Sequence, residues 1–316
     1  MRIRLPIGTA LLTVALVAGC SSTGPTPHPA PQPDTIPVIR PPEVTASPRV
    51  DHVAGLHLPI EAYMMRPEQL RMSSAAFSKV LGECMRSFGF TDPVEPSVAY
   101  QPSLMARRYG LTDPVNAARF GYHTAPGEDR TTTLRPALTR QLSAREQAVS
   151  FGYPDDKVKD AANEYRGRTV PAGGCHGEAQ RRVGFDLIDQ ADPDNVVNQI
   201  ASASLHQSES DSRVVKVLQR WSSCMASQGF RYDSPVGMAD HDEDLAESFH
   251  AQMASAREIR VARADVACKR RHNVVGVWFA VETAYQRTMI KQNESVLDGV
   301  RSAVEGSLRA CAEIGA

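Results

Sequence analysis

Apolar residues recur with helical spacing along most of the chain, and the clearest pattern occurs twice. In residues 77–88 apolar side chains fall three and four positions apart, and residues 214–225 repeat this spacing. Such a stripe predicts an amphipathic helix that buries one face. Both stripes run into the motif Cys-Met-x-Ser-x-Gly-Phe, at residues 84–90 and 224–230. The repeat therefore predicts two related helical halves.

The shared motif predicts how each of these helices ends. Gly89 and Gly229 lie where a helix commonly takes a left-handed residue, and the phenylalanine that follows supplies the hydrophobic contact beyond the cap. A proline comes soon after in both copies, so the helix does not resume. The motif therefore indicates architecture and says little about activity.

The second half shows helical periodicity almost throughout. Helices are predicted for residues 194–206 and 210–228, and the segment 240–272 opens with acidic and closes with basic residues, as suits a helix dipole. Its start, Asp-x-Asp-x-Asp, resembles a calcium loop, but the later glycine and glutamate of such a loop are absent, which favours a helix cap. In residues 277–311 the periodicity continues for about ten turns, which predicts one long C-terminal helix.

Residues 91–170 differ from the rest, because they are rich in glycine, proline, tyrosine and arginine and predict only short helices, near Pro114 and Ser143. We therefore expect a mostly α fold: a disulfide-stapled helical bundle built from two related halves, residues 51–190 and 191–316. The stretch 91–170 is a loop-rich insertion in the first half, and the long C-terminal helix packs across the bundle.

The N-terminus predicts the compartment. Residues 5–17 form an apolar run that two arginines precede and that ends in Leu-Val-Ala-Gly-Cys. This pattern is typical of a lipoprotein signal peptide, residues 1–19, whose cleavage leaves Cys20 to carry the lipid. Acyl chains would hold the protein on the extracytoplasmic face of the cell membrane without a transmembrane helix. An ordinary secretory peptide that is cut elsewhere stays open as the alternative.

Residues 20–50 are expected to form a tether behind the acylated cysteine. Prolines alternate with other residues from 25 to 33, and no hydrophobic periodicity is visible. At about 3.1 Å per residue, a polyproline-like segment of this length reaches on the order of 90 Å. A deliberate spacer and a linker without a role remain equally open.

Two disulfide bonds are expected, because the predicted compartment is oxidising and each copy of the motif is followed by one further cysteine. We predict the pairs Cys84–Cys175 and Cys224–Cys268, which leaves Cys311 as a free thiol on the apolar face of the last helix. In a chain-entropy account each bond would stabilise the fold by roughly 4 to 5 kcal/mol. Other pairings stay open. Zinc is the rival interpretation, but neither a C-x-x-C nor an H-x-H cluster supports it.

Composition and motifs exclude some functions. Taking Arg2 and Arg4 of the signal peptide from the 35 basic residues leaves 33 against 36 acidic ones, and the two signs are interleaved, which argues against nucleic acid. The usual hydrolase, zinc-peptidase, phosphate-binding and dinucleotide motifs are missing, and no cofactor or metal is indicated. A two-carboxylate glycosidase stays open, with Glu178 or Glu282 as candidates, although a salt bridge on a helix surface explains either residue more readily.

A candidate binding set lies in the insertion, because tyrosine and arginine are enriched at recognition surfaces. Its members are Tyr100, Arg107, Arg108, Tyr109, Arg119, Tyr122 and His123. The alternative is that these aromatic residues cover the bundle while the arginines are solvated.

Several stretches together resemble a known group of proteins. The lipobox, the paired Cys-Met-x-Ser-x-Gly-Phe motifs and the runs RRYGLTDPVNAARFGYH, VPAGGCHGEA and DVACKRRHNVVGVWFAVETAYQ are similar to a family of uncharacterised actinobacterial extracytoplasmic proteins and lipoproteins. The similarity covers most of residues 75–292. It implies a Gram-positive surface location and supports the cysteine pairing at the second copy. The family has no established activity, so no catalytic residue carries over.

The expected function is therefore that of a membrane-anchored extracytoplasmic lipoprotein whose biochemical activity is open. A non-catalytic binding or interaction module is favoured, with the lipid bilayer as one partner through acylated Cys20 and an envelope protein or cell-wall component as another. A cell-wall-directed hydrolase and a structural envelope lipoprotein without a small ligand are the alternatives. Whether the protein is an enzyme stays open from the sequence, and a protein without catalytic activity is favoured.

Overall fold

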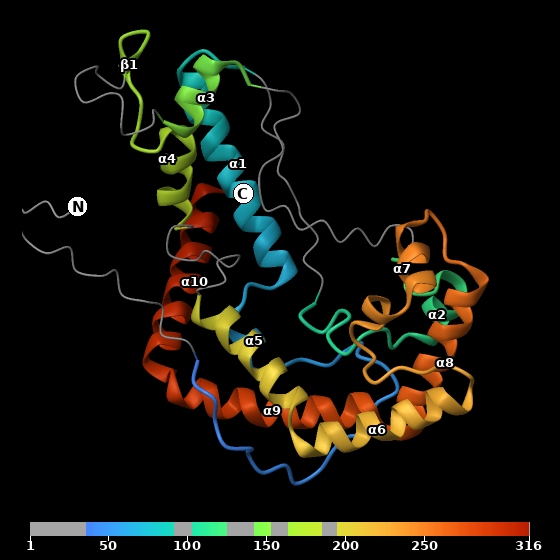
Figure 1. The fold of residues 1–316 in the computed structure, drawn as a ribbon. Helices are drawn as coiled ribbons and strands as arrows, with labels where there is room; N and C mark the ends of the chain where they lie inside the picture. The colour runs from blue at the N-terminus through green and yellow to red at the C-terminus, as the bar shows by residue number, and fades with distance from the viewer. Residues whose placement is uncertain (1–35, 92–102, 125–141, 153–163, 185–194, 316) are drawn as a thin grey trace, which may run out of the picture. The chain divides into compact units, whose positions relative to one another are not determined.

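Helices account for most of the chain that the computed structural model describes, namely residues 36–91, 103–124, 142–152, 164–184 and 195–315 (Figure 1). The elements of the first part are η1 (Pro59–Tyr63), α1 (Pro67–Ser87), α2 (Pro114–Phe120), α3 (Ala144–Phe151), the strands β1 (Glu164–Tyr165) and β2 (Arg168–Thr169), and α4 (Gly174–Val183). The second part contains α5 (Val196–Glu209), α6 (Ser212–Ser227), η3 (Met238–His241), α7 (Glu243–His250), α8 (Ala256–His272), α9 (Val274–Gln292) and α10 (Glu294–Ile314). The strands pair as a small antiparallel hairpin. The expected mostly α, disulfide-stapled helical bundle is confirmed.

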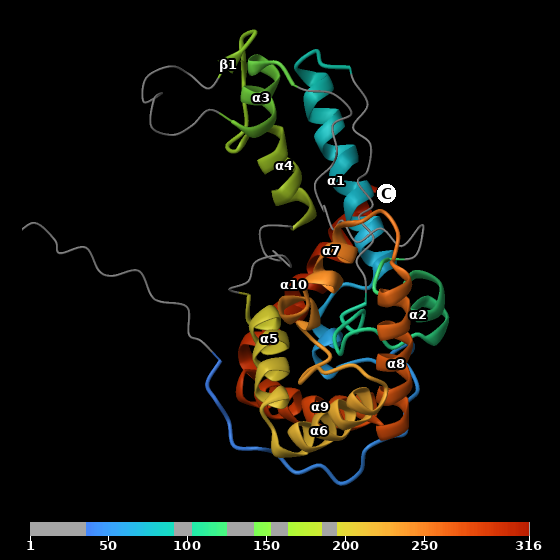
Figure 2. The same ribbon diagram turned by 45° about the vertical axis from the view of Figure 1, so that its right-hand side comes forward.

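Two large apolar cores, with two smaller apolar clusters, hold the helices that the structure describes. The first core lies between α1, α3, α4 and α10 and includes Phe77, Val80, Met85, Val149 and Val183. The second core is larger and gathers side chains from η1, α5, α6, α8 and α9, including Ile200, Trp221, Val261, Trp278 and Met289. Figures 1 and 2 show α1 beside α4, and α5 beside α9.

The two cores do not follow the two sequence halves. Helix α10 belongs to residues 191–316, yet it packs against α1 and α4 in the first core. Conversely, Ile60, Met105 and Tyr109 belong to residues 51–190, yet they are buried in the second core. Each half therefore lends an element to the core of the other.

Both copies of the repeated motif end their helices in the same geometry. The phenylalanine N–H donates to the carbonyl of the motif's methionine, at 3.1 Å in the first copy and 3.0 Å in the second. Gly89 and Gly229, just before it, have φ angles of 87° and 86°, which an L side chain adopts only with strain. The serine hydroxyl donates to the carbonyl of the motif's cysteine, at 2.7 Å in both copies. The repeat is therefore a repeat of structure.

Two disulfide bonds follow from these helix ends. Cys84 pairs with Cys175 and Cys224 pairs with Cys268, with Cα separations of 5.5 and 5.8 Å. These are the two pairs expected from the sequence. Cys311 is a free thiol, buried in the first core. One bond therefore lies in each core.

The helix boundaries of the second half depart from expectation in two places. The segment 240–272 contains two α-helices, and Asp242 caps the first of them by accepting from the Leu245 N–H at 3.0 Å. The prediction of one helix through residues 277–311 is wrong, because the chain turns at Asn293 between α9 and α10. The Asn293 side chain donates to the Met289 carbonyl at 2.8 Å and so competes with the backbone for that acceptor. Helix α10 remains a long C-terminal helix of 21 residues.

Residues 36–50, expected to be part of the tether, lie extended against the second core. Four of their apolar side chains, Ile36, Ile39, Val44 and Val50, pack on it. The prediction that residues 20–50 form a tether is therefore wrong for residues 36–50, which contact the folded domain. The physical reason is that side chains of α5 and α6, and of Asn273 between α8 and α9, form hydrogen bonds with its backbone. A search for periodicity does not detect such bonds. We call residues 36–50 the strap.

Candidate functional site

The candidate binding residues of the insertion do not share one exposed surface. Tyr100 lies outside the described residues. Arg119 is exposed on α2, with its guanidinium over the Phe120 ring. Arg107 donates to the His123 carbonyl at 3.1 Å. The other candidates are described next: Arg108, Tyr109 and Tyr122 form hydrogen bonds with buried carboxylates in the second half, and His123 lies near a third one.

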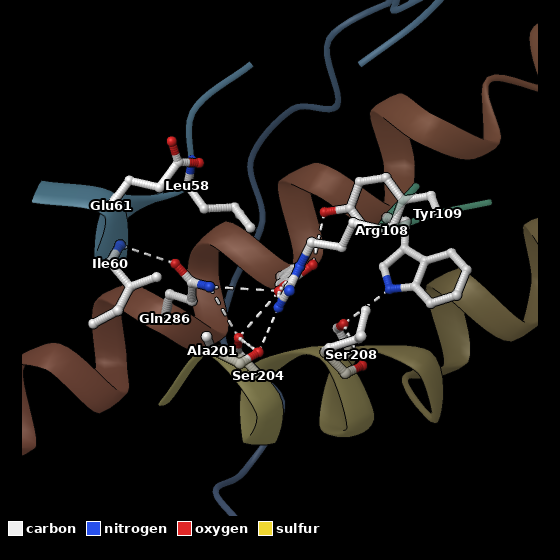
Figure 3. Close-up of polar contacts among 12 residues, drawn as sticks. Leu58, Ile60, Glu61, Arg108, Tyr109, Ala201, Ser204, Ser208 and Gln286 are labelled. Atoms are coloured by element: carbon white, nitrogen blue, oxygen red, sulfur yellow. Dashed lines mark hydrogen bonds and ion pairs between the residues drawn. The ribbon is translucent and has the colours of Figure 1, made fainter. Parts of the chain in front are cut away.

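Arg108 and Tyr109 are held by the carboxylate of Glu282 on α9 (Figure 3). The Arg108 Nε donates to Glu282 Oε1 at 2.8 Å, and a second guanidinium nitrogen contacts the same oxygen. The Tyr109 hydroxyl donates to Oε2 at 2.7 Å. The side chains of Arg108 and Glu282 are 7% and 0% exposed. Burial, together with the nearby carboxylate, raises the Tyr109 pKa well above its ordinary value. These charge-assisted hydrogen bonds, which are buried, fix Arg108 and Tyr109 on α9.

Two further polar groups complete this network. Ser204 on α5 donates to Glu282 Oε1 at 3.1 Å, and the Gln286 amide lies 3.4 Å from the same oxygen. Gln286 in turn accepts from the Ile60 N–H at 3.1 Å, which ties η1 to α9 (Figure 3). Both oxygens of Glu282 are therefore engaged and lie away from solvent. That arrangement suits a structural role, and not a general acid that must reach a substrate.

Tyr122 is bound to a second buried carboxylate. Asp265 on α8 accepts from the Tyr122 hydroxyl at 3.1 Å, from the Trp221 indole at 3.0 Å and from the Lys269 ammonium at 2.9 Å. Lys269 also donates to the Leu111 carbonyl at 2.9 Å. Burial raises the pKa of Asp265 and lowers that of Lys269, and their attraction opposes both shifts. The network fastens the insertion to α8.

Glu258, also on α8, holds the end of the same segment. It accepts from the Tyr122 N–H at 2.6 Å and from the Ser248 hydroxyl, and it lies 3.8 Å from Nδ1 of His123. Its side chain is fully buried. Three buried carboxylates thus position residues 107–123, and most of the candidate set forms internal contacts.

A groove with a volume of about 540 Å³ opens beside the first disulfide. It lies between the C-terminal part of α1, helix α4 and strand β2. The lining residues are Val80, Glu83, Cys84, Ser87, Phe88, Arg168, Thr169, Pro171, Glu178 and Arg182. Four of the ten lining residues are charged, so polar groups dominate the surface of the groove. Its volume lies in the range of small-molecule sites.

The charged groups of the groove differ in how far they are engaged. Arg182 lies 3.9 Å from Glu83, and both are about half exposed. Arg168 donates to the Ser87 carbonyl at 2.5 Å and covers the Phe88 ring, 5.5 Å from its centroid. In the part of the chain that the structure describes, Glu178 has neither a hydrogen bond nor an ion pair to its half-buried carboxylate. This carboxylate is therefore free to accept from a ligand.

Two of these groove residues are named from the sequence, Cys84 as a disulfide cysteine and Glu178 as a possible glycosidase carboxylate, but no prediction brings them together. A usable signal was nevertheless present. Glu178 and Arg182 follow Cys175 by three and seven positions on a helix, so they share its face. Once Cys84 and Cys175 are paired, that face must lie next to the end of α1.

Searches of protein-family models, curated proteins and solved structures find no match to this chain. None of the helices among the described residues is long and apolar enough to cross a membrane. The same residues contain no group of three or more His, Cys, Asp or Glu side chains arranged to hold a metal ion. Cys20 lies outside them.

Proposed function

We propose that this chain is a lipid-anchored extracytoplasmic protein that acts as a non-catalytic binding module at the cell envelope, with the groove beside Cys84–Cys175 as its binding site. Support for the location comes from the lipoprotein pattern that ends at Cys20 and from the two disulfide bonds, which suit an oxidising compartment. The observation that carries the binding role is the Glu178 carboxylate, which faces an open groove without an internal partner.

The groove chemistry favours a ligand that carries both signs of charge. Glu178 offers an acceptor for an ammonium or amide donor, while Arg168 keeps guanidinium N–H groups beyond the one that binds Ser87. Val80 and Phe88 also line the groove, but both are almost fully buried, so polar groups carry most of the recognition. A short peptide with free amino and carboxyl groups meets these requirements, and the peptide stems of cell-wall polymers are of this class.

A matched pair of variants tests the binding site. Soluble muropeptides, whose stems carry free amines and carboxylates, are titrated against the full-length protein by isothermal calorimetry. Glu178→Gln is expected to weaken binding about tenfold or more, because it removes the charged acceptor. Glu305→Gln, an exposed α10 carboxylate 4.0 Å from Arg309, is the control and should bind like the wild type. Equal affinity of both variants, or no binding by the wild type, contradicts the proposed site.

A cell-wall hydrolase is the second candidate, because two carboxylates, Glu83 and Glu178, line the same groove. A turnover assay on purified peptidoglycan, with products separated by chromatography, distinguishes the two functions. Release of fragments by the wild type but not by Glu178→Gln would replace the binding role with catalysis.

Lipid anchoring has its own test. Cells that express the chain are grown with an alkyne fatty acid, and the protein is examined for the label. The wild type is expected to carry it and to remain with the membrane fraction, whereas Cys20→Ser should lose both properties. A labelled Cys20→Ser protein would place the lipid elsewhere.

A further inference from the structure

The strap is bound to the second core by two amide side chains that contact it in the same way. At its start the Ile39 N–H donates to Gln207 Oε1 at 3.0 Å, and Gln207 Nε2 donates to the Pro37 carbonyl at 3.1 Å. One primary amide therefore offers an acceptor and a donor to one short piece of backbone. A neighbouring β-strand offers its partner the same pair of groups.

The second contact repeats this geometry 11 residues later. The Val50 N–H donates to Asn273 Oδ1 at 3.1 Å, and Asn273 Nδ2 donates to the Pro48 carbonyl at 3.0 Å. The two bound pieces of strap, Pro37-Val38-Ile39 and Pro48-Arg49-Val50, share the pattern proline, any residue, branched apolar residue. In both, the carbonyl of the proline and the N–H two residues on are the bonded groups.

A third contact lies between the two amides. Arg213 on α6 donates to the Pro42 carbonyl at 2.9 Å. The guanidinium is itself fixed by Asp211, through bonds of 2.8 and 2.7 Å. A positioned donor is therefore available to a proline, whose backbone lacks an N–H and can take part only through its carbonyl.

A glycine makes room for the strap. Gly276 is the third residue of α9, and a glycine within a helix usually has a packing reason. A Cβ atom at this position would lie 1.9 Å from the Pro48 carbonyl oxygen. The strap backbone therefore approaches the helix more closely than any side chain allows.

We propose that Gln207, Arg213, Asn273 and Gly276 form a binding site for an extended, proline-containing peptide, and that residues 36–50 of the same chain are its resident ligand. Recognition is directed at the backbone of two Pro-x-Ile/Val units, with the branched side chains turned to the second core. Prolines suit such a ligand because they hold the free chain extended and so reduce the entropy lost on binding.

The first test is amide hydrogen exchange on the full-length protein, read at single residues. The Ile39 and Val50 N–H groups are expected to be protected in the wild type. Gly276→Ala should speed exchange at Val50 by about tenfold or more, because the strap can no longer close on α9. The matched control is Gly299→Ala, a helix-interior glycine of α10 with no atom within 4 Å of its added Cβ. Unprotected Ile39 and Val50 in the wild type would overturn the proposal.

The second test asks whether the site accepts its ligand from solution. In Ile39→Asp/Val50→Asp the resident strap should no longer dock, while the helices keep their own residues. A fluorescent peptide of residues 36–50 is expected to bind this variant, to bind the wild type at least about tenfold more weakly because the strap competes, and to fail on the variant that also carries Gly276→Ala. Equal binding to all three, or none to the strap variant with its tryptophan spectrum unchanged, overturns the proposal.

Discussion

The two cores contain the same helix end and the same kind of staple, yet their interiors differ. The first core is apolar apart from a few hydroxyl groups and Glu146 at its margin. The disulfide Cys84–Cys175 joins α1 to α4 there. The second core buries the carboxylates Glu258, Asp265 and Glu282 together with Lys269. The repeated motif therefore determines how its helix ends, but it does not determine whether the surrounding core contains buried charges.

The buried charges of the second core have a clear purpose in the fold. They lie where residues 107–123 of the insertion contact α8 and α9. Apolar contacts are not directional, so they would leave the register of such an irregular segment loosely defined, whereas buried hydrogen bonds fix it. The first core joins mainly regular helices, for which packing and one covalent bond suffice. Both tryptophans, Trp221 and Trp278, are in the second core, which gives this comparison a ready spectroscopic probe.

Removing each staple should produce the largest effects. The bond Cys84–Cys175 closes 91 residues and Cys224–Cys268 closes 44, so the chain-entropy account gives losses of about 4.6 and 4.0 kcal/mol. Each cysteine pair is replaced by alanine, and urea unfolding is followed by tryptophan fluorescence and by circular dichroism. Loss of the first bond is expected to lower the dichroism midpoint more than the fluorescence midpoint. Identical shifts of the two signals would show that the cores unfold as one unit.

Removing the buried ion pair between Glu282 and Arg108 should have the second-largest effect on stability. Glu282→Gln leaves the Arg108 guanidinium buried without its counter-charge, and the free energy of unfolding is expected to fall by about 3 to 5 kcal/mol. Tryptophan fluorescence in urea measures this loss directly. Glu305→Gln, whose partner Arg309 is exposed, should change stability by less than about 0.5 kcal/mol. A Glu282→Gln loss below about 1 kcal/mol would mean that the buried pair contributes little.

The two helix ends can be compared at their glycines. Gly89→Ala and Gly229→Ala place a side chain at positive φ, which is expected to cost about 1 to 2 kcal/mol at each position. The cost should be similar in the two copies and slightly larger at Gly89, where the new Cβ lies 3.0 Å from Arg166. Thermal unfolding of both variants gives the answer. Losses that differ by more than about 1 kcal/mol would contradict the equivalence of the two caps.

The smallest expected effect is a pH dependence that belongs to the second core. The hydrogen bond from Arg213 holds the pKa of Asp211 below its ordinary value, against the opposing effect of burial. The stabilisation is therefore complete above the pKa of the unfolded chain, near 3.8, and is lost as the pH falls through the lower folded value. The urea midpoint of the wild type should drop more steeply below about pH 4 than that of Asp211→Asn. Asp298→Asn, exposed on α10, should match the wild type.

The parts of the fold that could be predicted are those with a regular signal. The stripes ending at Gly89 and Gly229 predicted both helix ends, and the order of the cysteines predicted both disulfides. The break at Asn293 escaped, because an asparagine in a polar position resembles any exposed helix residue until its side chain bonds a carbonyl. Apolar periodicity reports burial of a face and cannot report a competition for one acceptor.

The surroundings of the candidate binding residues could not be predicted from local patterns in the sequence. Tyrosines and arginines in a loop suggested a recognition surface, but Arg108 and Tyr109 meet Glu282, which lies more than 170 positions away in the chain. No spacing rule anticipates a pairing of that length. The groove depends on a covalent contact, so its residues Glu178 and Arg182 become visible only when Cys175 is given its partner.

Docking of the strap changes the mechanics of attachment, if Cys20 is acylated as proposed. The chain between Cys20 and Ile36 can span only about 50 Å even when fully extended like polyproline, roughly half the reach of a tether that ends at residue 50. A pull on the lipid is then carried as shear by the bonds of Gln207, Arg213 and Asn273 into the second core. The groove beside Cys84–Cys175 is lined by other residues, so none of these three contacts belongs to it.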